Sequence, residues 1–536
     1  MTGLTSMNRA LNQIPKRAEK REGPQLHETF VDSGVADVVD TLDNQVLNGR
    51  RGTGKTHALA YLESERGARG DLALRIDLRT VGSPDGVLDP SVSTPTDRAA
   101  RLLVDLLGQF RDALLEAVVS DEELVEDGRF VEKLDELIVA LTNVRLDGEV
   151  EVSSESEDKQ SNRSGGSIKV SVGASSSAQV GVNTDSGTEG RALLRETRRG
   201  SERIALNFSD VARALREVAA TLSSRRVWLL LDEWSSVPRD IQPYLAEFLV
   251  RCVLPLQRFV VKIAAIEQQA SFRAEVGNTT VGIELGADMS ASVSLDDFMV
   301  FEGNEDQARN FFMGLFFKHL TAADDEIISV DGLNSPSDVV RLGFTDTRAF
   351  DELVRAAEGV PRDALSIAAR AAMRAGSDRI SVPIVREAAR SWYHSDKIKA
   401  LESREEARKL LNWIIDRVIR TKRARAFLVS ETHSRDPLLL SLFDARVLHI
   451  VRRGYSAQDR PGERYEVWAI DYGAYVDLIQ TKNAPLGFLP LGGDDDKDDD
   501  DDHVDDDYVD LAEVPKQDLR AIRRAILDLD AYHLTG

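Results

Sequence analysis

The feature that most constrains this chain is a run of eight residues, Gly49-Arg50-Arg51-Gly52-Thr53-Gly54-Lys55-Thr56. It fits the pattern G-x-x-x-x-G-K-[ST] at every fixed position. A short apolar segment, 46–47, precedes it, and a helix-compatible segment, 57–62, follows it. In such a loop the glycines let backbone N–H groups turn toward phosphate oxygens, and the N-terminus of the next helix favours the same negative charge. The run therefore predicts a phosphate-binding loop between a strand and a helix of an α/β fold.

The last two side chains of the run predict which phosphate-bearing ligand it binds. The Lys55 ammonium would place its positive charge on the outer phosphates of a nucleotide, and the Thr56 hydroxyl is a ligand for Mg²⁺. We therefore expect residues 49–56 to bind ATP, with Mg²⁺ as the accompanying ion. We also expect Lys55 to act in catalysis, because a cation at this place stabilises charge on a transferred phosphoryl group.

A second acidic element stands much later in the chain. The apolar run Val227-Trp228-Leu229-Leu230-Leu231 reads as a buried strand, and Asp232-Glu233 follows it directly. Acidic residues begin many ordinary loops, so this pair has meaning only together with the loop at 49–56. In that context Asp232 is expected to hold the Mg²⁺ shell and Glu233 to orient or deprotonate a water molecule. The two elements together predict an enzyme that hydrolyses ATP to ADP and phosphate.

The order of apolar patterns predicts the domain organisation. Strands alternate with helices over 28–300, which predicts a parallel sheet with helices on both faces. Helical spacing alone follows over 301–395. Residues 396–486 combine helices with a hairpin, whose strands are expected at 447–455 and 464–470 with a turn at 459–462. Residues 1–27 are polar and locally basic and read as a flexible arm, and 487–536 read as an acidic linker with a terminal helix over 514–532.

One insertion interrupts the first of these domains. Residues 149–190 are rich in Ser and Gly and contain no Leu, Phe, Trp, Tyr or Met. Apolar residues alternate with polar ones over 168–174 and 178–182, which is also the pattern of a hairpin. The default interpretation is an irregular Ser/Gly-rich loop, and the first alternative is a hairpin that docks on a neighbouring subunit or partner. Membrane insertion is the last alternative, because strands of about seven residues fall short of the ~9–11 that a bilayer requires.

Composition excludes several classes of protein. The net charge is −23, and twelve Asp residues against one Lys within 494–510 account for −11 of it, so a strongly basic nucleic-acid coat is excluded. The single cysteine, Cys252, excludes a disulfide framework and a cysteine zinc cluster. No apolar run reaches the ~18 residues of a membrane span, and the first thirty residues lack the apolar core of a secretory signal. We expect a cytoplasmic protein with no membrane partner.

At the loop 49–56 and the strand that ends in Asp232-Glu233, the chain resembles AAA+ and related STAND-type ATPases, most closely the origin-recognition or replication-initiator clade. Two later features fit the resemblance: the strand 260–266, which ends in the polar Glu267, and Gly359-Val360-Pro361-Arg362, which opens a helix. The resemblance implies a helical lid over 301–395 whose Arg362 reaches the γ-phosphate, and a winged helix over 396–486. It also implies a γ-phosphate sensor near Glu267, and an arginine finger for which Arg273 is a candidate.

The resemblance leaves two functions open. One is an AAA+-like molecular switch driven by ATP turnover and associated with DNA; the other is a STAND-type signalling or anti-phage defence ATPase that acts through protein partners. A homo-oligomer formed with ATP and a protein effector are the partners that these functions imply. Pro437 to Asp444, at the position of a recognition helix, contains no Arg, Lys, Asn or Gln to read base edges. We therefore expect weak, non-specific nucleic-acid binding at most.

Overall fold

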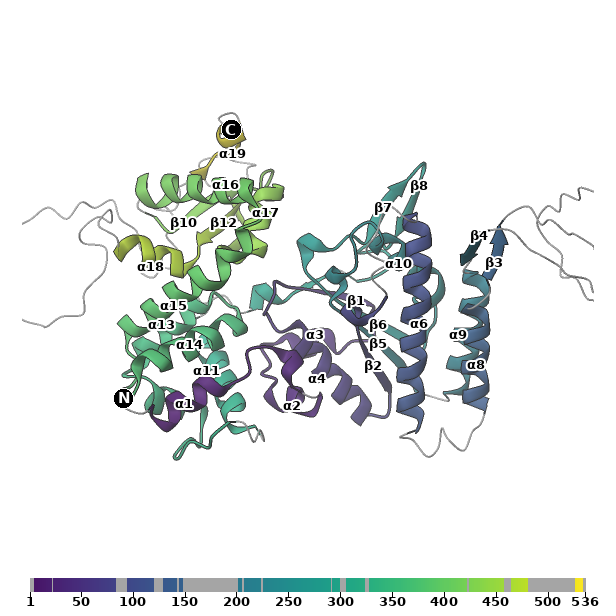
Figure 1. Cartoon of the computed structure of the whole chain (residues 1–536), viewed down its shortest axis with the longest axis horizontal. Helices are drawn as coiled ribbons and strands as arrows, with labels where there is room; N and C mark the ends of the chain where they lie inside the picture. Colours follow the sequence, from purple (N-terminus) through teal and green to yellow (C-terminus); the bar gives the residue numbers. More distant parts are fainter. Residues whose placement is uncertain are drawn as a thin grey trace, which may run out of the picture.

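The structure is a computed structural model of the whole chain. It describes residues 4–21, 23–82, 94–119, 129–141, 144–147, 201–204, 207–222, 225–290, 292–298, 305–322, 327–421, 424–456, 464–480 and 526–533. Two lobes lie side by side: the first contains the large parallel sheet, and the second contains a group of helices and a smaller sheet (Figure 1). The predictions for 149–190, for the acidic run at 494–510 and for the turn at 459–462 lie outside the described residues.

The first lobe is built on a five-stranded parallel sheet in the order β2-β5-β6-β1-β9. The strands are β1 (Gln45–Asn48), β2 (Leu72–Asp77), β5 (Val227–Asp232), β6 (Phe259–Ala265) and β9 (Val293–Ser294). Both β5 and β6 are buried along their whole length, as expected for near-continuous apolar runs covered on two faces. The predicted α/β fold with a phosphate-loop core is confirmed.

Helices cover both faces of this sheet, so its apolar residues divide into two cores. Val35, Leu59 and Leu230 belong to one core, and Leu102, Leu215 and Leu231 belong to the other. The first core is made by α3 (Val35–Val39) and α4 (Lys55–Ala68). The helices of the second face are α6 (Pro95–Val119), α8 (Arg129–Leu141), α9 (Phe208–Thr221) and α10 (Gln242–Phe248).

Two details of this lobe differ from expectation. Alternating apolar residues over 281–285 predict a further strand of the sheet, but the structure instead has a small antiparallel hairpin of β7 (Arg273–Val276) and β8 (Thr279–Gly282), outside the main sheet. The fifth strand of the sheet is instead the two-residue β9, which is too short to show a period in the sequence. Next to the 149–190 insertion, β3 (Val144–Asp147) and β4 (Ser201–Ile204) pair antiparallel.

The second lobe begins with a helical unit, which we call the lid. Its helices are α11 (Glu305–Thr321), α12 (Pro336–Gly343), α13 (Thr347–Ala357), α14 (Pro361–Ala375) and α15 (Val382–Trp392). Phe312, Phe350 and Ala368 lie in its core, and each is fully buried.

The N-terminal segment also belongs to the lid, and the prediction of a flexible arm over 1–27 is wrong. Residues Ser6–Gln13 form α1, and Met7, Leu11 and Ile14 on one face of it are buried in the lid core. The three apolar residues are spaced four and three apart, so they lie on one face of a helix. The basic residues around them make the segment polar on average, and the average composition therefore does not reveal this face. Residues Gly23–Thr29 then form α2, which leads back to the first lobe.

The third unit joins helices to a sheet in the order β11-β12-β10-β13. Its elements are α16 (Glu405–Ile415), β10 (Ala426–Ser430), α17 (Pro437–Asp444), β11 (Leu448–Ser456), β12 (Arg464–Ile470) and α18 (Tyr472–Gln480). The antiparallel pairing of β11 and β12 is the hairpin that the sequence predicts. That this unit belongs to the winged-helix class stays a prediction.

The terminal helix expected over 514–532 is shorter in the part of it that the structure describes. Residues 526–527 form β13, which adds parallel to β10, and Leu529–His533 form α19. Leu527 and Leu529 are buried in the third unit, and this burial anchors the segment. Throughout the described ranges, no helix combines the length and the apolar character that crossing a membrane requires.

Candidate active site

The loop at 49–56 connects β1 to α4, as its sequence predicts, and its glycines have identifiable tasks. Gly52 and Gly54 have φ of 92° and 101°, in the left-handed region that favours glycine. At Gly49 a Cβ would lie 2.5 Å from Thr53 Oγ1, which itself donates a hydrogen bond to Arg50 O at 2.9 Å. The loop is therefore folded tightly on itself, with α4 beginning directly after it.

Lys55 lies back over this loop. Its Nζ donates to Gly49 O at 2.7 Å and to Arg50 O at 3.0 Å, and its side chain is 7% exposed. Burial lowers the pKa of Lys55, and the carboxylates of Glu233, Asp296 and Asp232 oppose that shift. The ammonium thus donates to two backbone carbonyl oxygens, and phosphate oxygens could replace them as its hydrogen-bond acceptors.

Asp232 and Thr56 meet at the carboxyl end of the sheet, although 176 positions separate them in the sequence. Asp232 ends β5, is 1% exposed, and accepts a hydrogen bond from the Thr56 hydroxyl. Burial raises the pKa of Asp232, and the bond from Thr56 opposes this. A hydroxyl and a carboxylate side by side are hard oxygen donors of the kind that Mg²⁺ prefers, so the residues present fit that ion.

Glu233 lies on the wall of the cavity in front of the loop. Its φ of 56° is left-handed, which is uncommon for a residue with a side chain, and its N–H donates to Asp232 Oδ1 at 2.9 Å. A local backbone conformation of this kind costs about 1–3 kcal/mol and is concentrated at functional sites. The structure therefore brings Lys55, Thr56, Asp232 and Glu233 together.

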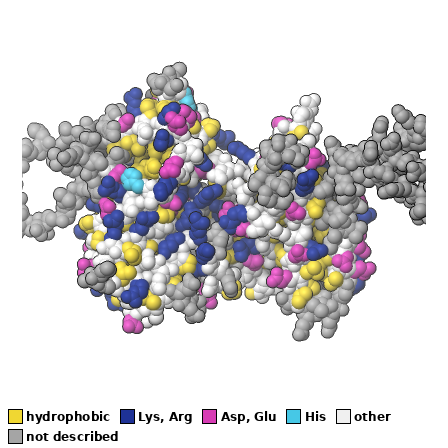
Figure 2. Space-filling view, viewed as in Figure 1, with side chains coloured by type: hydrophobic (Ala, Val, Ile, Leu, Met, Phe, Trp, Pro, Cys, Tyr) yellow, Lys and Arg dark blue, Asp and Glu magenta, His cyan; other side chains and the backbone are white. Residues whose placement is uncertain are grey.

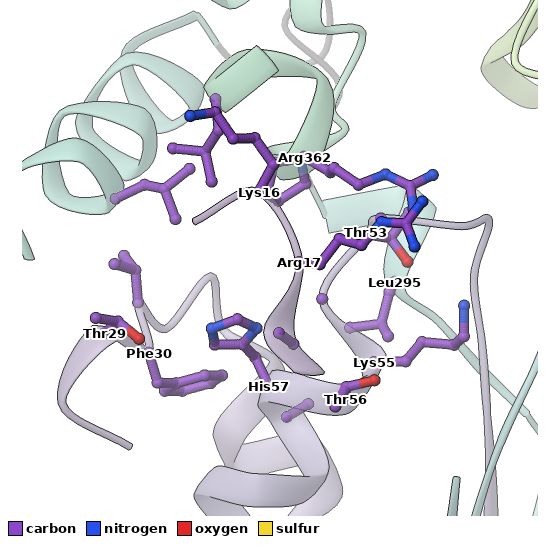
Figure 3. A pocket seen from close by; sticks show the side chains of 18 of the residues that line it. Lys16, Arg17, Thr29, Phe30, Thr53, Lys55, Thr56, His57, Leu295 and Arg362 are labelled. Carbon is purple, nitrogen blue, oxygen red and sulfur yellow. The ribbon is translucent and has the colours of Figure 1, made fainter. Parts of the chain in front are cut away.

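The cavity has a volume of about 340 Å³, within the range of small-molecule sites. Residues 51–56 form one wall, the lid residues Pro361 and Arg362 form another, and the segment 15–18 between α1 and α2 closes it. Figure 3 shows Arg17 and Arg362 pointing to the same side of the loop, at the end where phosphate charge would lie.

The other end of the cavity is apolar and suits a nucleobase. Phe30, Phe311, Leu315 and Leu365 line it. His319 lines it as well; it is 2% exposed, and burial lowers its pKa well below the usual range, so the ring is neutral at pH 7. Its Nδ1 has no hydrogen-bond partner within the described residues, so it is available to a ring nitrogen or amino group of a base.

Arg362 contacts the loop directly. Its backbone N–H donates to Gly52 O at 3.3 Å, and its Nη2 donates to Arg51 O at 3.4 Å. A Cβ on Gly52 would lie 2.7 Å from Arg362 Cβ, so the lid approaches the loop only because residue 52 is glycine. Burial lowers the pKa of Arg362. The structure thus places Arg362 against the phosphate loop; that it reaches a γ-phosphate there stays a prediction.

Arg50 lies elsewhere, contrary to the expectation that it binds the nucleotide. Its N–H donates to Asp296 Oδ2 at 2.9 Å and its Nε donates to Asp296 Oδ1 at 2.6 Å. Its Nη1 lies 2.6 Å from Nδ1 of His449 in β11, and its guanidinium lies 4.6 Å from the ring centre of Phe443 in α17. Only 3% of the side chain is exposed. Arg50 therefore ties the phosphate loop to the third unit.

Three buried groups next to Arg50 have the spacing of metal ligands. Ligand atoms of Glu358, His449 and Asp471 lie within 4.8 Å of one another. Each already faces a cation: Glu358 pairs with Arg425, Asp471 lies 2.6 Å from Lys397 Nζ, and His449 contacts Arg50. Because these cations supply the balancing charge, the cluster is an ion-pair junction between the loop, the lid and the third unit rather than a metal centre.

Four basic residues of the cavity were not predicted from the sequence. Lys16, Arg17 and Arg21 were assigned to a flexible arm, and Arg79, which is paired with Asp77 at the end of β2, was not considered. For Arg79 a signal existed, since polar residues after parallel strands gather at the same sheet edge. For Lys16 and Arg17 none existed, because their position depends on α1 docking to the lid.

Two residues implied by the resemblance lie away from the cavity. Glu267 follows β6 and lies 3.8 Å from Arg453 of the third unit. Arg273 is exposed on the β7–β8 hairpin and lies 3.5 Å from Glu284. Neither lines the cavity as the described residues form it, so a γ-phosphate sensor and an arginine finger at these positions stay predictions.

The fold and the loop define the class: the chain has the α/β core of the P-loop NTPase fold. No family model and no curated protein sequence matches it. Among solved structures it is similar to a Walker-type ATPase of Pyrococcus abyssi, with 12% identity and a TM-score of 0.35 over 86% of this chain and 97% of that one.

Two other solved structures are similar to the chain. For Cdc6p of Pyrobaculum aerophilum the identity is 12% and the TM-score 0.26, over 87% of this chain and 94% of that one. For a lysine-to-arginine mutant of RuvB from Thermotoga maritima the values are 11% and 0.29, over 87% and 98%. At such identities and TM-scores, no substrate or partner of these proteins transfers to this chain.

Proposed function

We propose that the chain binds Mg²⁺-ATP in the cavity at the phosphate loop and hydrolyses it to ADP and phosphate. The observation that carries this proposal is that Lys55, Thr56 and Glu233 line one cavity. Asp232 accepts a hydrogen bond from Thr56 beside them, although β5 lies far from the loop in the sequence. A phosphate loop alone would support binding. The acidic pair at the end of β5 adds the groups that hydrolysis needs.

Each residue then has a definite task. The backbone N–H groups of the loop and the Lys55 ammonium bind the outer phosphates, and Arg362 adds a second positive charge from the lid. Thr56 and Asp232 hold the Mg²⁺, which when bound neutralises phosphate charge. Glu233 accepts the proton of the attacking water, or orients that water, from the cavity wall.

The test of hydrolysis is Glu233→Gln, which keeps the size of the side chain and removes the base. We expect Mg²⁺-ATP binding to persist and turnover to fall by roughly 10²-fold or more, the scale of losing a positioned base. Glu402→Gln is the matched control, because Glu402 is exposed and does not line the cavity. If Glu233→Gln turned over ATP at the parent rate, Glu233 would be structural and the site would only bind nucleotide.

For the work that turnover performs, we propose a switch that acts through protein contacts, as in STAND-type ATPases, rather than a sequence-specific DNA-binding motor. The observation that favours it is α17, in which Leu439, Leu442 and Phe443 are buried in the core of the third unit. The test compares ATP turnover of the full chain with and without duplex DNA at ~150 mM salt, where non-specific phosphate contacts weaken. Strong stimulation by one selected duplex sequence would favour the DNA-associated alternative.

The switch is also proposed to assemble with ATP into a homo-oligomer. An arginine supplied by a neighbouring subunit would then complete the site, as such residues do in other phosphoryl-transfer enzymes. Sedimentation of Glu233→Gln with ATP and with ADP tests this. An ATP-dependent rise in mass supports assembly, and a monomer under both conditions contradicts it.

A further inference from the structure

A second cavity, of about 290 Å³, lies beside the first. The two cavities share Lys16, Arg17, Arg51 and Arg362. The rest of the second cavity comes from Gln269 of the first lobe, from Ser366 of α14, from the end of α15, from the connection to α16, and from the end of α17 and the residues after it. The first lobe, the lid and the third unit therefore all contribute to it. It is therefore a separate space that adjoins the triphosphate end of the first.

The wall of this second cavity is strongly basic. Six basic side chains line it against two carboxylates: Lys16, Arg17, Arg51, Arg362, Arg404 and Arg446 against Asp396 and Asp444. Arg446 and Asp396 are paired with each other. The other five cations have no carboxylate at ion-pair distance within the described ranges. Figure 2 shows Lys and Arg side chains gathered on this face between the two lobes.

Two polar atoms of the lining are buried without a partner. Among the described residues, the indole N–H of Trp392 donates no hydrogen bond and Oδ1 of Asp444 accepts none. Burial of such atoms without partners costs about 1–3 kcal/mol each, so a bound group that bonds to them would recover that free energy. Trp392 offers a donor and Asp444 an acceptor, beside guanidinium groups that bind phosphate oxygens.

We propose that this second cavity binds a small phosphate-bearing ligand with more than one negative charge. Cations without carboxylate partners supply the charge, and Trp392 and Asp444 supply directional contacts to the rest of the ligand. The site goes beyond the proposed function, because it requires no hydrolysis and has residues of its own, Arg404, Trp392 and Asp444. The ligand has two sources: phosphate released by ATP hydrolysis next door, or a phosphorylated small molecule from solution.

The test uses the full chain saturated with Mg²⁺ and a non-hydrolysable ATP analogue, which fills the first cavity. Labelled inorganic pyrophosphate is then titrated by equilibrium dialysis. We expect about one pyrophosphate per chain, and binding at least about tenfold weaker in Arg404→Gln, the scale of one lost charge-assisted bond. Arg408→Gln is the matched control, since it removes the same exposed side chain one helical turn further along, outside both cavities.

No pyrophosphate binding by the parent chain, or equal weakening by both variants, would overturn the proposal. Two arms then separate the sources. Slower release of phosphate from the parent than from Arg404→Gln in a single turnover identifies the hydrolysis product, whereas binding of AMP in place of inorganic phosphate identifies a phosphomonoester from solution. If the ATP analogue itself does not bind, the proposed function is wrong, and titration of the nucleotide-free chain still tests the second cavity.

Discussion

At the scale of single residues, the site depends on a few side chains held by backbone atoms of their own loop. Lys55 Nζ is bonded to two carbonyl oxygens of the loop that it follows. This contact keeps a buried ammonium partnered when no phosphate is bound, which avoids the full cost of an isolated buried charge. Lys55 thus needs no partner elsewhere in the fold, and its replacement should affect the ligand more than the fold.

We therefore expect Lys55→Ala to abolish detectable ATP binding, while its free energy of unfolding stays within about 1 kcal/mol of that of the parent. The variant removes the ammonium that would bind the phosphates. Because this ammonium is desolvated in the folded chain, its loss changes the free energy of unfolding little. Fluorescent-nucleotide titration and urea denaturation measure the two quantities. Lys409→Ala, on an exposed side chain of α16, is the control, and unchanged nucleotide affinity in Lys55→Ala would contradict the assignment.

A second prediction at this scale concerns pH. Burial lowers the pKa of His449 to about 3, whereas a histidine in an unfolded chain titrates near 6.5. As the pH falls through 6.5, the unfolded chain gains a proton that the native state refuses, so the free energy of unfolding falls. One such histidine accounts for a loss of about 2 kcal/mol between pH 7.5 and pH 5.

His449→Gln should remove that share of the pH dependence, whatever it does to stability at pH 7.5. Urea denaturation at a series of pH values measures the slope, and His533→Gln, at the surface of α19, serves as the control. A slope in His449→Gln equal to that of the parent would show that His449 does not stay neutral in the native state.

At the scale of elements, the contact of α14 with the phosphate loop depends on one missing side chain. Gly52 O accepts the Arg362 N–H, and a Cβ at residue 52 would collide with Arg362. We expect Gly52→Ala to push the lid from the loop and to weaken ATP binding by about tenfold or more, since both phosphate contacts and lid closure suffer.

Gly70→Ala separates this collision from backbone strain. Gly70 has a φ of 86°, close to that of Gly52, but a Cβ there meets nothing within 4 Å. Both variants should lose a similar amount of stability from the left-handed backbone, about 1 kcal/mol. Isothermal titration should show the loss of ATP affinity in Gly52→Ala alone. Equal losses in both variants would mean that the lid does not depend on residue 52.

The elements also show how far sequence reasoning reaches. The loop at 49–56, the strand that ends at Asp232 and the helix Pro437–Asp444 were predictable, because glycine spacing, apolar runs and a capping Asp436 act over a few residues. The side chain of Arg50 was not, since its partner His449 lies 399 positions away. Nor were Lys16 and Arg17, whose place in the cavity follows from the docking of α1.

At the scale of the whole molecule, the loop, the lid and the third unit meet in one buried network of charges. Arg50 reaches His449, which lies 3.0 Å from Asp471, and Lys397 bridges Asp471 to Asp363 of α14 at 2.6 and 3.0 Å. Asp363 follows Arg362 directly, so a shift of Arg362 toward a bound nucleotide would be felt across the network. This arrangement gives the third unit a physical route for responding to the occupancy of the cavity.

We predict that Arg50→Gln loosens the third unit from the first lobe without preventing nucleotide binding. Loss of a buried cation from this network leaves His449 and Asp296 with fewer partners, which costs stability on the order of 3 kcal/mol. Limited proteolysis should then cut the 396–404 connection faster than in the parent. Arg348→Gln, at an exposed position of α13 outside both cavities, is the control, and equal cutting rates in Arg50→Gln and the parent would contradict the prediction.

The same network determines where the chain can be divided into stable fragments. A fragment that ends before residue 396 would leave Glu358 and Asp363 without Arg425, Arg446 and Lys397, and a fragment that starts there would strand those cations at a new surface. Removing the third unit, or replacing it with that of another protein, would therefore leave buried charges unpaired. The resulting chain would be unstable whether or not its contacts with a partner protein were kept. Chimeras of this protein should keep both sides of the junction together and place their boundaries in the first lobe.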